Sequence, residues 1–387
     1  MWEYGAKSNF INIGGEGMYL WIVLLCSLLL IPITRYAFIV GNNRMNEKKN
    51  GKNLYIMLFS MILIVLTGWR ADSVGKDTVM YHQLYDIAKS TSSISDVFNL
   101  WQNRSIEKGY IFIEFLLSRI MDFHSASLIF AIIAIVPVMI LIFRYSENYW
   151  FSIFVYLAFG MYTFTFAGIR QSLAMGICCL AFMFAEKQEF FKYFIAIILA
   201  ASMHISALIF APVYWLIRVK HTPRNIRLFF LGIIASFGLR SVIYKILNMF
   251  SRYSYESNDT AGGVKLYLFI LGTLILSYFV SRPFFEDKIL EENMQTNLNR
   301  NTSVFNMVAF CALLWPITSA NAVVFRLYYY YFLFLVLFIP NFISNISDKN
   351  NKLIVGSVYL IIGGYFLQFY TLGNSQMMYR TYAFFWE

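Results

Sequence analysis

Long apolar segments recur along the whole chain, and they constrain its fold more than any other feature. A helix needs about 20 mostly apolar residues to cross the hydrocarbon core of a bilayer. Of the 387 residues, 59% are hydrophobic and only 13% are charged, which is too apolar for a water-soluble surface. We therefore expect an all-α, polytopic integral membrane protein with about 12, and at least about 10, transmembrane helices. The segments lie at 18–40, 53–69, 125–143, 150–167, 171–185, 190–203, 205–217, 228–248, 264–281, 303–320, 326–344 and 353–370.

Polar residues are too few for a large soluble domain, so we expect a single membrane domain over residues 1–387, with one distinct subregion at 70–124. This subregion contains polar turns and the segment GYIFIEFLLSRIM, whose periodicity predicts a helix lying on or dipping into the membrane. Loops longer than about 12 to 15 residues are usually functional or disordered. The aromatic content of 70–124 argues against disorder, so we expect short helices there.

The distribution of basic residues predicts the orientation. Short cytoplasmic loops are rich in Lys and Arg, and such clusters follow the first and seventh apolar segments. Alternation from these loops places residues 70–124 on the non-cytoplasmic side. The net charge of +10 is then a property of membrane topology, and we predict no nucleic-acid partner. The cluster residues are Arg44, Lys48, Lys49 and Lys52, then Arg218, Lys220, Arg224 and Arg227.

Four ionisable residues at the ends of apolar segments fall on this same non-cytoplasmic side: Arg70, Arg170, His204 and Arg326. A charge near hydrocarbon is costly and is often functional. A single arginine could snorkel to the headgroups, and His204 could be a core histidine, but four together favour one pocket. Guanidinium forks match phosphate oxygens, so the pocket suits the diphosphate of a polyprenyl lipid.

Transfer of a sugar from such a lipid to a hydroxyl group needs a base. His204, Asp77 and Glu107 are the candidates, with His124 and His221 weaker. Each carboxylate could instead be an ion-pair partner of an arginine. The sequence has no DxD motif and no recognisable His/Asp ligand cluster, so we predict no metal and no cofactor.

Five motifs occur in order between the apolar segments: GWRADSVGKDTVMYHQLY, EKGYIFIE, GIRQSLAMGI, SMHISALIF and VFRLYYYYF. In this combination the chain, from about Arg70 to Pro340, resembles the EpsG-like branch of the Wzy-type polysaccharide polymerases, which make O-antigen, capsule or exopolysaccharide. The resemblance implies a helical fold similar to the lipid-dependent membrane glycosyltransferases (GT-C-like). It also implies a multi-pass protein of the bacterial inner (cytoplasmic) membrane, with its active site facing the periplasm or the extracellular side.

The implied activity is that of an oligosaccharide repeat-unit polymerase, a glycosyltransferase. The growing glycan leaves undecaprenyl diphosphate and joins a hydroxyl of the next lipid-linked repeat unit. From the arginine pocket we further expect a reaction that needs no metal, and from a single displacement we expect inversion at the anomeric carbon. Both substrates are undecaprenyl-diphosphate-linked oligosaccharides, and a flippase and a chain-length regulator are candidate partners beside the lipid bilayer.

The family motifs match individual residues of this chain. One departure is Lys76, where such proteins more often carry a small hydroxyl residue. On this basis the expected diphosphate-binding residues are Arg70, Arg170 and Arg326. The expected catalytic residues are His204, Asp77 and Glu107, and the expected supporting residues are Gly75, Tyr81, Tyr110 and Gln171.

Three other functions remain open: an O-antigen-ligase-like glycan transferase, a lipid-linked oligosaccharide flippase and a solute transporter. The ligase would share the pocket and differ in its acceptor. A flippase should carry charges along a central path through the spans, and here Arg240 and Lys245 are the exceptions to mostly apolar mid-spans. A transporter often has paired broken spans in repeated halves, and no such repeat is visible.

Overall fold

The computed structural model describes residues 18–40, 47–75, 77–101, 106–250, 263–280, 300–319, 322–372 and 382–386. Within these ranges the regular structure is helical, as expected, and β-type pairing is limited to one isolated bridge between Arg70 and Phe384. Lys76 lies outside the described residues. The elements are α1 (Met18–Val40), α2 (Glu47–Gly68), α3 (Thr78–Ser90), α4 (Ile94–Trp101), α5 (Lys108–Ser118), α6 (Phe123–Tyr145), α7 (Tyr149–Ala158), α8 (Phe164–Ala167), α9 (Ile169–Glu186), α10 (Phe190–Met203), η3 (Ile205–Phe210), α11 (Val213–Leu216), α12 (Pro223–Phe250), α13 (Val264–Val280), α15 (Arg300–Thr318), α16 (Ala322–Phe325), η4 (Arg326–Tyr328), α17 (Tyr329–Phe332), α18 (Leu335–Ser344) and α19 (Lys349–Leu372).

Five helical segments of the described chain are long and apolar enough to cross a membrane, and five shorter apolar helices accompany them. The long segments are Gly51–Gly68, Phe123–Tyr145, Ile169–Glu186, Arg300–Thr318 and Arg326–Ser344. These helices establish a polytopic membrane protein. The expected total of about 12 spans stays a prediction, as does the likeness to the GT-C fold.

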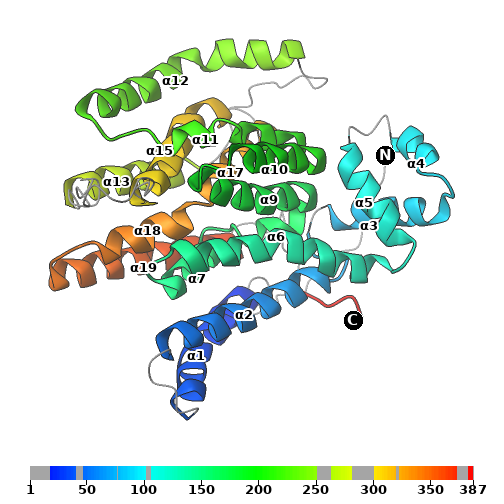
Figure 1. Ribbon diagram of the computed structural model, residues 1–387, viewed down its shortest axis with the longest axis horizontal. Coiled ribbons are helices and arrows are strands. Elements are labelled where there is room, and N and C mark those ends of the chain that lie inside the picture. Colours follow the sequence, from blue (N-terminus) through cyan, green and yellow to red (C-terminus); the bar gives the residue numbers. More distant parts are fainter. Residues whose placement is uncertain are drawn as a thin grey trace.

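Helix α9 lies at the centre of the bundle, between α6 and α10, and α2 packs on α6 (Figure 1). Most of α9 is buried, because nearly every residue after Arg170 is apolar or small and contacts a neighbouring helix. Side-chain caps fix where two neighbouring helices begin: Asp122 accepts a hydrogen bond from the backbone N–H of Ser125 (3.0 Å) at α6, and Asn148 accepts one from Phe151 (3.2 Å) at α7.

Three of the expected apolar segments are broken, and in one of them, 326–344, η4 and α17 are separated from α18 by a turn at 333–334. The segment 150–167 forms α7, turns at Gly160 in the left-handed region (φ 72°), and ends in the four-residue α8. The segment 205–217 forms η3, a turn and α11 in place of one helix. These two breaks place non-helical backbone next to Arg170, at the start of α9, and next to His204, which follows α10.

Helices α3, α4 and α5 form the subregion expected at 70–124, and they lie together at one end of the bundle (Figure 1). We call this the α3–α5 end. Helix α5 contacts α3 and the end of α10. The C-terminal segment also reaches this end, where the Ala71 N–H donates to the Ala383 carbonyl (2.8 Å) and the Phe385 N–H donates to the Trp69 carbonyl (3.0 Å).

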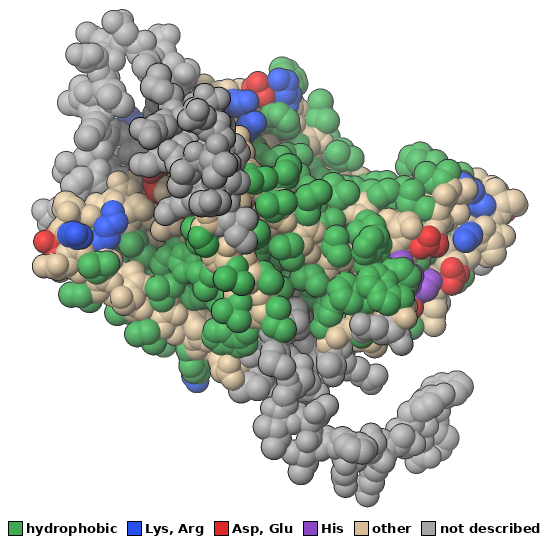
Figure 2. Space-filling view, turned by 90° about the horizontal axis from the view of Figure 1, so that it is seen from below, with side chains coloured by type: hydrophobic (Ala, Val, Ile, Leu, Met, Phe, Trp, Pro, Cys, Tyr) green, Lys and Arg blue, Asp and Glu red, His purple; other side chains and the backbone are tan. Residues whose placement is uncertain are grey.

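The loops predicted to be cytoplasmic contact one another at the opposite end. Lys52 lies 3.5 Å from the Ser146 carbonyl oxygen, Arg300 lies over the Tyr145 ring, and Arg218 donates to the Ala185 carbonyl. On the face shown in Figure 2, hydrophobic side chains cover most of the central surface, and charged ones lie around its edge, including both ends of the long axis. The bundle therefore has two polar ends, as the alternation of loops requires.

Candidate functional site

A cluster of three side chains connects α5, α9 and α10 at the α3–α5 end. Glu107, directly before α5, accepts a hydrogen bond from Arg170 Nη1 on one carboxylate oxygen. Its other oxygen accepts the backbone N–H of Ile205 (3.0 Å) and lies 3.3 Å from His204 Nδ1. The side chains of Glu107 and Arg170 are only 13% and 17% exposed. Burying one of these charges alone would cost folding free energy. The ion pair between Arg170 and Glu107 offsets this cost for both residues.

Gly109 allows this cluster to form. A Cβ atom at this position would lie 2.5 Å from Ser202 Oγ and 2.7 Å from the Ser202 backbone oxygen. Only glycine therefore lets the first turn of α5 approach the end of α10 so closely. That approach places Glu107 beside His204.

Tyr81 holds the Arg170 side chain, and Tyr110 packs against the Tyr81 ring. Arg170 Nε donates to the Tyr81 hydroxyl (3.1 Å), and the rings of Tyr81 and Tyr110 meet edge to face at 5.7 Å. Both rings are buried. Asp77 is partly exposed, one helical turn before Tyr81, and its charge contributes to the raised pKa of that hydroxyl, for which burial is the main cause.

Arg326 belongs to the same region. Gln171 Nε2 donates to the backbone carbonyl of Arg326 (2.7 Å), which joins the start of η4 to the start of α9. The Arg326 side chain is exposed, and its charge acts on His204. The structure thus brings Arg170, Arg326 and His204 together, although they come from three distant parts of the sequence.

Burial lowers the pKa of His204 to about 4. The positive charges of Arg170 and Arg326 act in the same direction, and the carboxylate of Glu107 opposes them. The imidazole is therefore neutral at pH 7, which is the form that can accept a proton.

Three polar residues beside this cluster were not among the predicted site residues: Ser206, Tyr330 and Glu114. Ser206 Oγ lies 3.2 Å from His204 Nδ1 and 2.9 Å from the Tyr330 hydroxyl, so a polar chain continues toward α17. Glu114 on α5 is fully buried, and burial raises its pKa to about 8 against the opposing effects of Tyr110 and Arg170. A sequence signal existed for Glu114, because it follows Tyr110 by four residues and so shares its helix face.

Arg70 has different surroundings. It is 3% exposed, and its guanidinium group donates to the carbonyls of Val74 (3.1 Å), Thr67 and Phe166 (3.3 Å) and to Thr78 Oγ1 (3.3 Å). These contacts occupy the donors that a diphosphate would need, so the geometry does not favour the expected substrate-binding role. Burial lowers the pKa of Arg70 to about 10, and the group stays charged at neutral pH.

Gly75 explains how the loop after Arg70 packs. Its backbone has φ +97°, and a Cβ atom would lie 2.2 Å from the Phe166 carbonyl oxygen, which is one of the acceptors of Arg70. Gly75 and Arg70 therefore join the loop before α3 to the break between α8 and α9.

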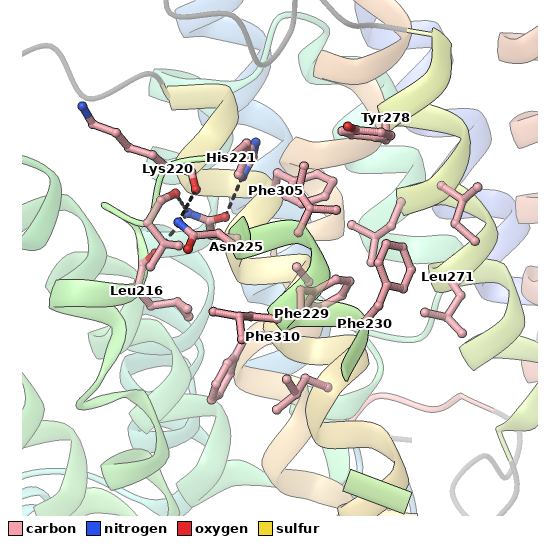
Figure 3. A pocket seen from close by; sticks show the side chains of 18 of the residues that line it. Leu216, Lys220, His221, Asn225, Phe229, Phe230, Leu271, Tyr278, Phe305 and Phe310 are labelled. Carbon is pink, nitrogen blue, oxygen red and sulfur yellow. Dashed lines mark hydrogen bonds between the residues drawn. The ribbon is translucent and has the colours of Figure 1, made fainter. Parts of the chain in front are cut away.

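A cavity of about 490 Å³ lies elsewhere in the bundle, between α12, α13 and α15 (Figure 3). Its lining is mostly apolar, including Phe229, Phe230 and Leu271, and Lys220 and His221 lie at one edge. Asn306 anchors that edge by donating to the carbonyls of Leu216 (3.0 Å) and Val219 (2.9 Å). A cavity with this lining suits hydrocarbon chains, and it does not include the Arg170 cluster.

These observations define the class of the protein: an α-helical membrane protein with a mostly buried Arg–Glu–His cluster beside a subregion of short helices. The model of the EpsG family matches residues 53–384, from α2 to the segment that pairs with Trp69–Ala71. The chain belongs to the EpsG family, as its ordered motifs predicted. Membership indicates a polysaccharide polymerase of the glycosyltransferase type. No curated protein and no solved structure matches the chain.

Proposed function

We propose that the protein polymerises a bacterial surface polysaccharide at the non-cytoplasmic face of the inner membrane. It transfers the growing glycan from undecaprenyl diphosphate to a hydroxyl of the next lipid-linked repeat unit. The observation that carries this proposal is the contact of Glu107 with both Arg170 and His204, with Arg326 beside them, in a member of the EpsG family.

Arg170 and Arg326 bind the leaving diphosphate. Tyr81 and Glu107 hold Nε and Nη1 of Arg170, and Nη2 makes no hydrogen bond with another described residue. This arrangement leaves one edge of a fixed guanidinium group for a phosphate oxygen. Because negative charge grows on the diphosphate as it departs, preorganised cations there stabilise the transition state without requiring a metal.

His204 is the proposed base. His204 Nδ1 lies 3.3 Å from Glu107 Oε1, and in its unprotonated form it accepts the backbone N–H of Ser206 (3.4 Å). The proposed reaction uses the other tautomer, in which Nδ1–H donates to Glu107 and Nε2 carries the lone pair that accepts the proton of the acceptor hydroxyl. The hydroxyl oxygen bonds to the anomeric carbon while the bond from that carbon to the diphosphate oxygen breaks, and the electron pair leaves with the diphosphate. A single displacement of this kind inverts the anomeric carbon. Asp77 is the alternative base. Glu107 contacts both Arg170 and His204, so we propose that it positions these two side chains and does not act as the base.

The test uses purified protein in nanodiscs, with a polyprenyl-diphosphate oligosaccharide as the sole substrate and no added divalent cation. We expect a ladder of repeat lengths that is lost in Arg170→Ala, Arg326→Ala and His204→Gln. Arg144→Ala, at the opposite end of the bundle, is the matched control and should retain the ladder.

Two outcomes would contradict the proposal. If the wild-type protein forms no ladder but moves the lipid across a liposome bilayer, the cluster belongs to a flippase. If it forms no ladder but transfers a single glycan to a different added acceptor, the protein is a ligase. A ladder that appears only on addition of Mg²⁺ or Mn²⁺ would contradict metal independence alone.

A further inference from the structure

A second group of polar side chains lies at the α3–α5 end, on a different face of α3 from the Tyr81 side chain that contacts Arg170. Asp72 in the loop before α3, His82 on α3 and His124 at the start of α6 each offer a ligand atom, and these atoms lie within 4.8 Å of one another. The whole chain has only four histidines, so the meeting of two of them with a carboxylate is notable. Histidine and acidic side chains are neighbours at one end of the face shown in Figure 2.

Hydrogen bonding within the group accounts for only part of its polar atoms. His82 Nδ1 lies 2.6 Å from Asp72 Oδ2. Asp72 Oδ1 and His124 Nδ1 are both buried and have no hydrogen-bond partner among the described residues. A buried polar atom without a partner is destabilising, and a metal ion, which accepts lone pairs, would satisfy both residues.

Aromatic rings fix the orientation of both imidazoles. Phe123 stacks on His82 at 4.4 Å with an interplanar angle of 12°, and Phe385 stacks on His124 at 4.3 Å and 17°. Such packing limits the rotation of the rings and so holds both imidazoles in a fixed orientation. Phe385 is itself held by its backbone hydrogen bond to Trp69.

We propose that Asp72, His82 and His124 bind a divalent transition-metal ion, and that Zn²⁺ is the ion their ligand atoms fit best. Two imidazoles and a carboxylate are typical zinc ligands, and a fourth tetrahedral position is left for water. Metal–ligand bonds of about 2.0 to 2.2 Å place tetrahedral ligand atoms about 3.3 Å apart, so modest side-chain rotation completes the site.

The charge of the group suits a cation. Asp72 is negative, both imidazoles are neutral ligands when they bind a metal, and Asp86 and Asp122 lie nearby. Arg70 is the opposing charge, but its guanidinium group is directed to the carbonyls of Thr67, Val74 and Phe166. The side chains of His82 and Asp72 are 29% and 36% exposed, so an ion can enter from solvent.

An ion bound here would connect the loop after Arg70, α3, the start of α6 and the C-terminal segment. His82 adjoins Tyr81, which holds Arg170, so the metal would fix α3 against the bundle from outside the reaction centre. This role is structural, and it is independent of whether the protein is a polymerase.

The test uses full-length protein without a polyhistidine tag, stripped with a chelator and titrated with ZnCl₂ by calorimetry and with CoCl₂ by visible absorption. We expect about one equivalent to bind, with Co²⁺ bands of tetrahedral coordination and a rise in the melting temperature. His124→Gln and Asp72→Asn should bind more than about 100-fold more weakly, because even second-shell changes cost 10- to 100-fold. His221→Gln, at the far cavity, is the matched control and should bind as wild type.

The proposal is overturned if stripped wild-type protein binds less than about 0.2 equivalents at micromolar Zn²⁺, or if the two ligand variants bind as tightly as His221→Gln. Circular dichroism and gel filtration show whether each variant is folded. Should His124→Gln fail to fold, Asp72→Asn decides, because asparagine keeps the shape of the side chain and removes the charge. None of these readouts depends on polymerase activity.

Discussion

At the scale of single residues, Arg170 does more than supply a positive charge. Its Nε and Nη1 are held by Tyr81 and Glu107, which fixes the plane of the guanidinium group. Lysine cannot reproduce this fork. We therefore expect Arg170→Lys to lower the initial rate of ladder formation by at least about 100-fold, nearly as much as Arg170→Ala, in line with the loss of one preorganised donor. Arg144→Lys is the control, and wild-type activity in Arg170→Lys would refute the role of the fork.

Glu114 gives a second prediction at this scale, and it concerns stability. The carboxyl group has a pKa of about 8 in the folded protein, raised by burial from about 4.5. The folded state therefore binds this proton more tightly than the unfolded state, so Glu114 makes stability fall as the pH rises between these values. In Glu114→Gln we expect a smaller drop in melting temperature between pH 5 and pH 8.5 (about the two ends of that window). Equal drops in both proteins would show that Glu114 does not titrate in this way.

The candidate site was partly predictable at the residue scale. Loop charges sorted the chain into two sides, and this placed Arg170, His204 and Glu107 at one end before any contact was known. The contacts of Arg70 could not be predicted, because they include the Phe166 carbonyl at the break before α9, 96 residues away in the sequence. The meeting of His124 with Asp72 and His82 was also missed, since His124 lies outside their motif and appears in sequence as an ordinary helix start.

At the scale of elements, the contact between α5 and α10 controls the geometry of the cluster. Valine at position 109 would clash with Ser202, so α5 must move away from α10 and take Glu107 with it. Misplacing a reacting group by about 1 Å can cost about 100-fold in rate, and overpacking costs about 1 to 3 kcal/mol in stability. We expect Gly109→Val to lose activity by about this factor while remaining folded.

The neighbouring residue provides the control for this element. Lys108→Ala changes an exposed side chain on the same turn and should retain activity. A Gly109→Val protein with wild-type rates would mean that the close approach of α5 and α10 is not needed for the reaction. Steady-state rates and gel filtration of both variants decide between these outcomes.

Hydropathy predicted the positions of the helices well and the breaks within them poorly. Each expected apolar segment coincides with helical structure, because a 3.6-residue repeat satisfies backbone hydrogen bonds wherever water is absent. The breaks at 159–163 and within 205–217 contain Gly160 and Pro212, which are local signals for a helix break. These signals do not decide the outcome, because Pro32 and Pro137 lie inside the continuous helices α1 and α6. These breaks depend on tertiary contacts, for example the donation of the Tyr331 hydroxyl to the Ile209 carbonyl (2.6 Å).

At the scale of the whole molecule, the two polar ends predict a testable orientation. Ser90 ends α3 at the α3–α5 end, and Lys192 begins α10 at the opposite end; both are exposed. Three native cysteines are buried and Cys26 is partly exposed, so Cys26→Ala provides a low background. In that background we expect an impermeant maleimide to label Ser90→Cys in intact cells and Lys192→Cys only after lysis.

This labelling pattern bears on the reaction as well as on topology. A repeat-unit polymerase acts on glycans that have already crossed the membrane, so its cluster must lie at the end labelled from outside. Since α10 leads from Lys192 to His204, and His204 contacts Glu107, the two positions report on opposite ends of one helix. Labelling of Lys192→Cys alone in intact cells would place the Arg170 cluster at the cytoplasm, where a polymerase of flipped lipid-linked substrates could not work, and the proposed function would fail with it.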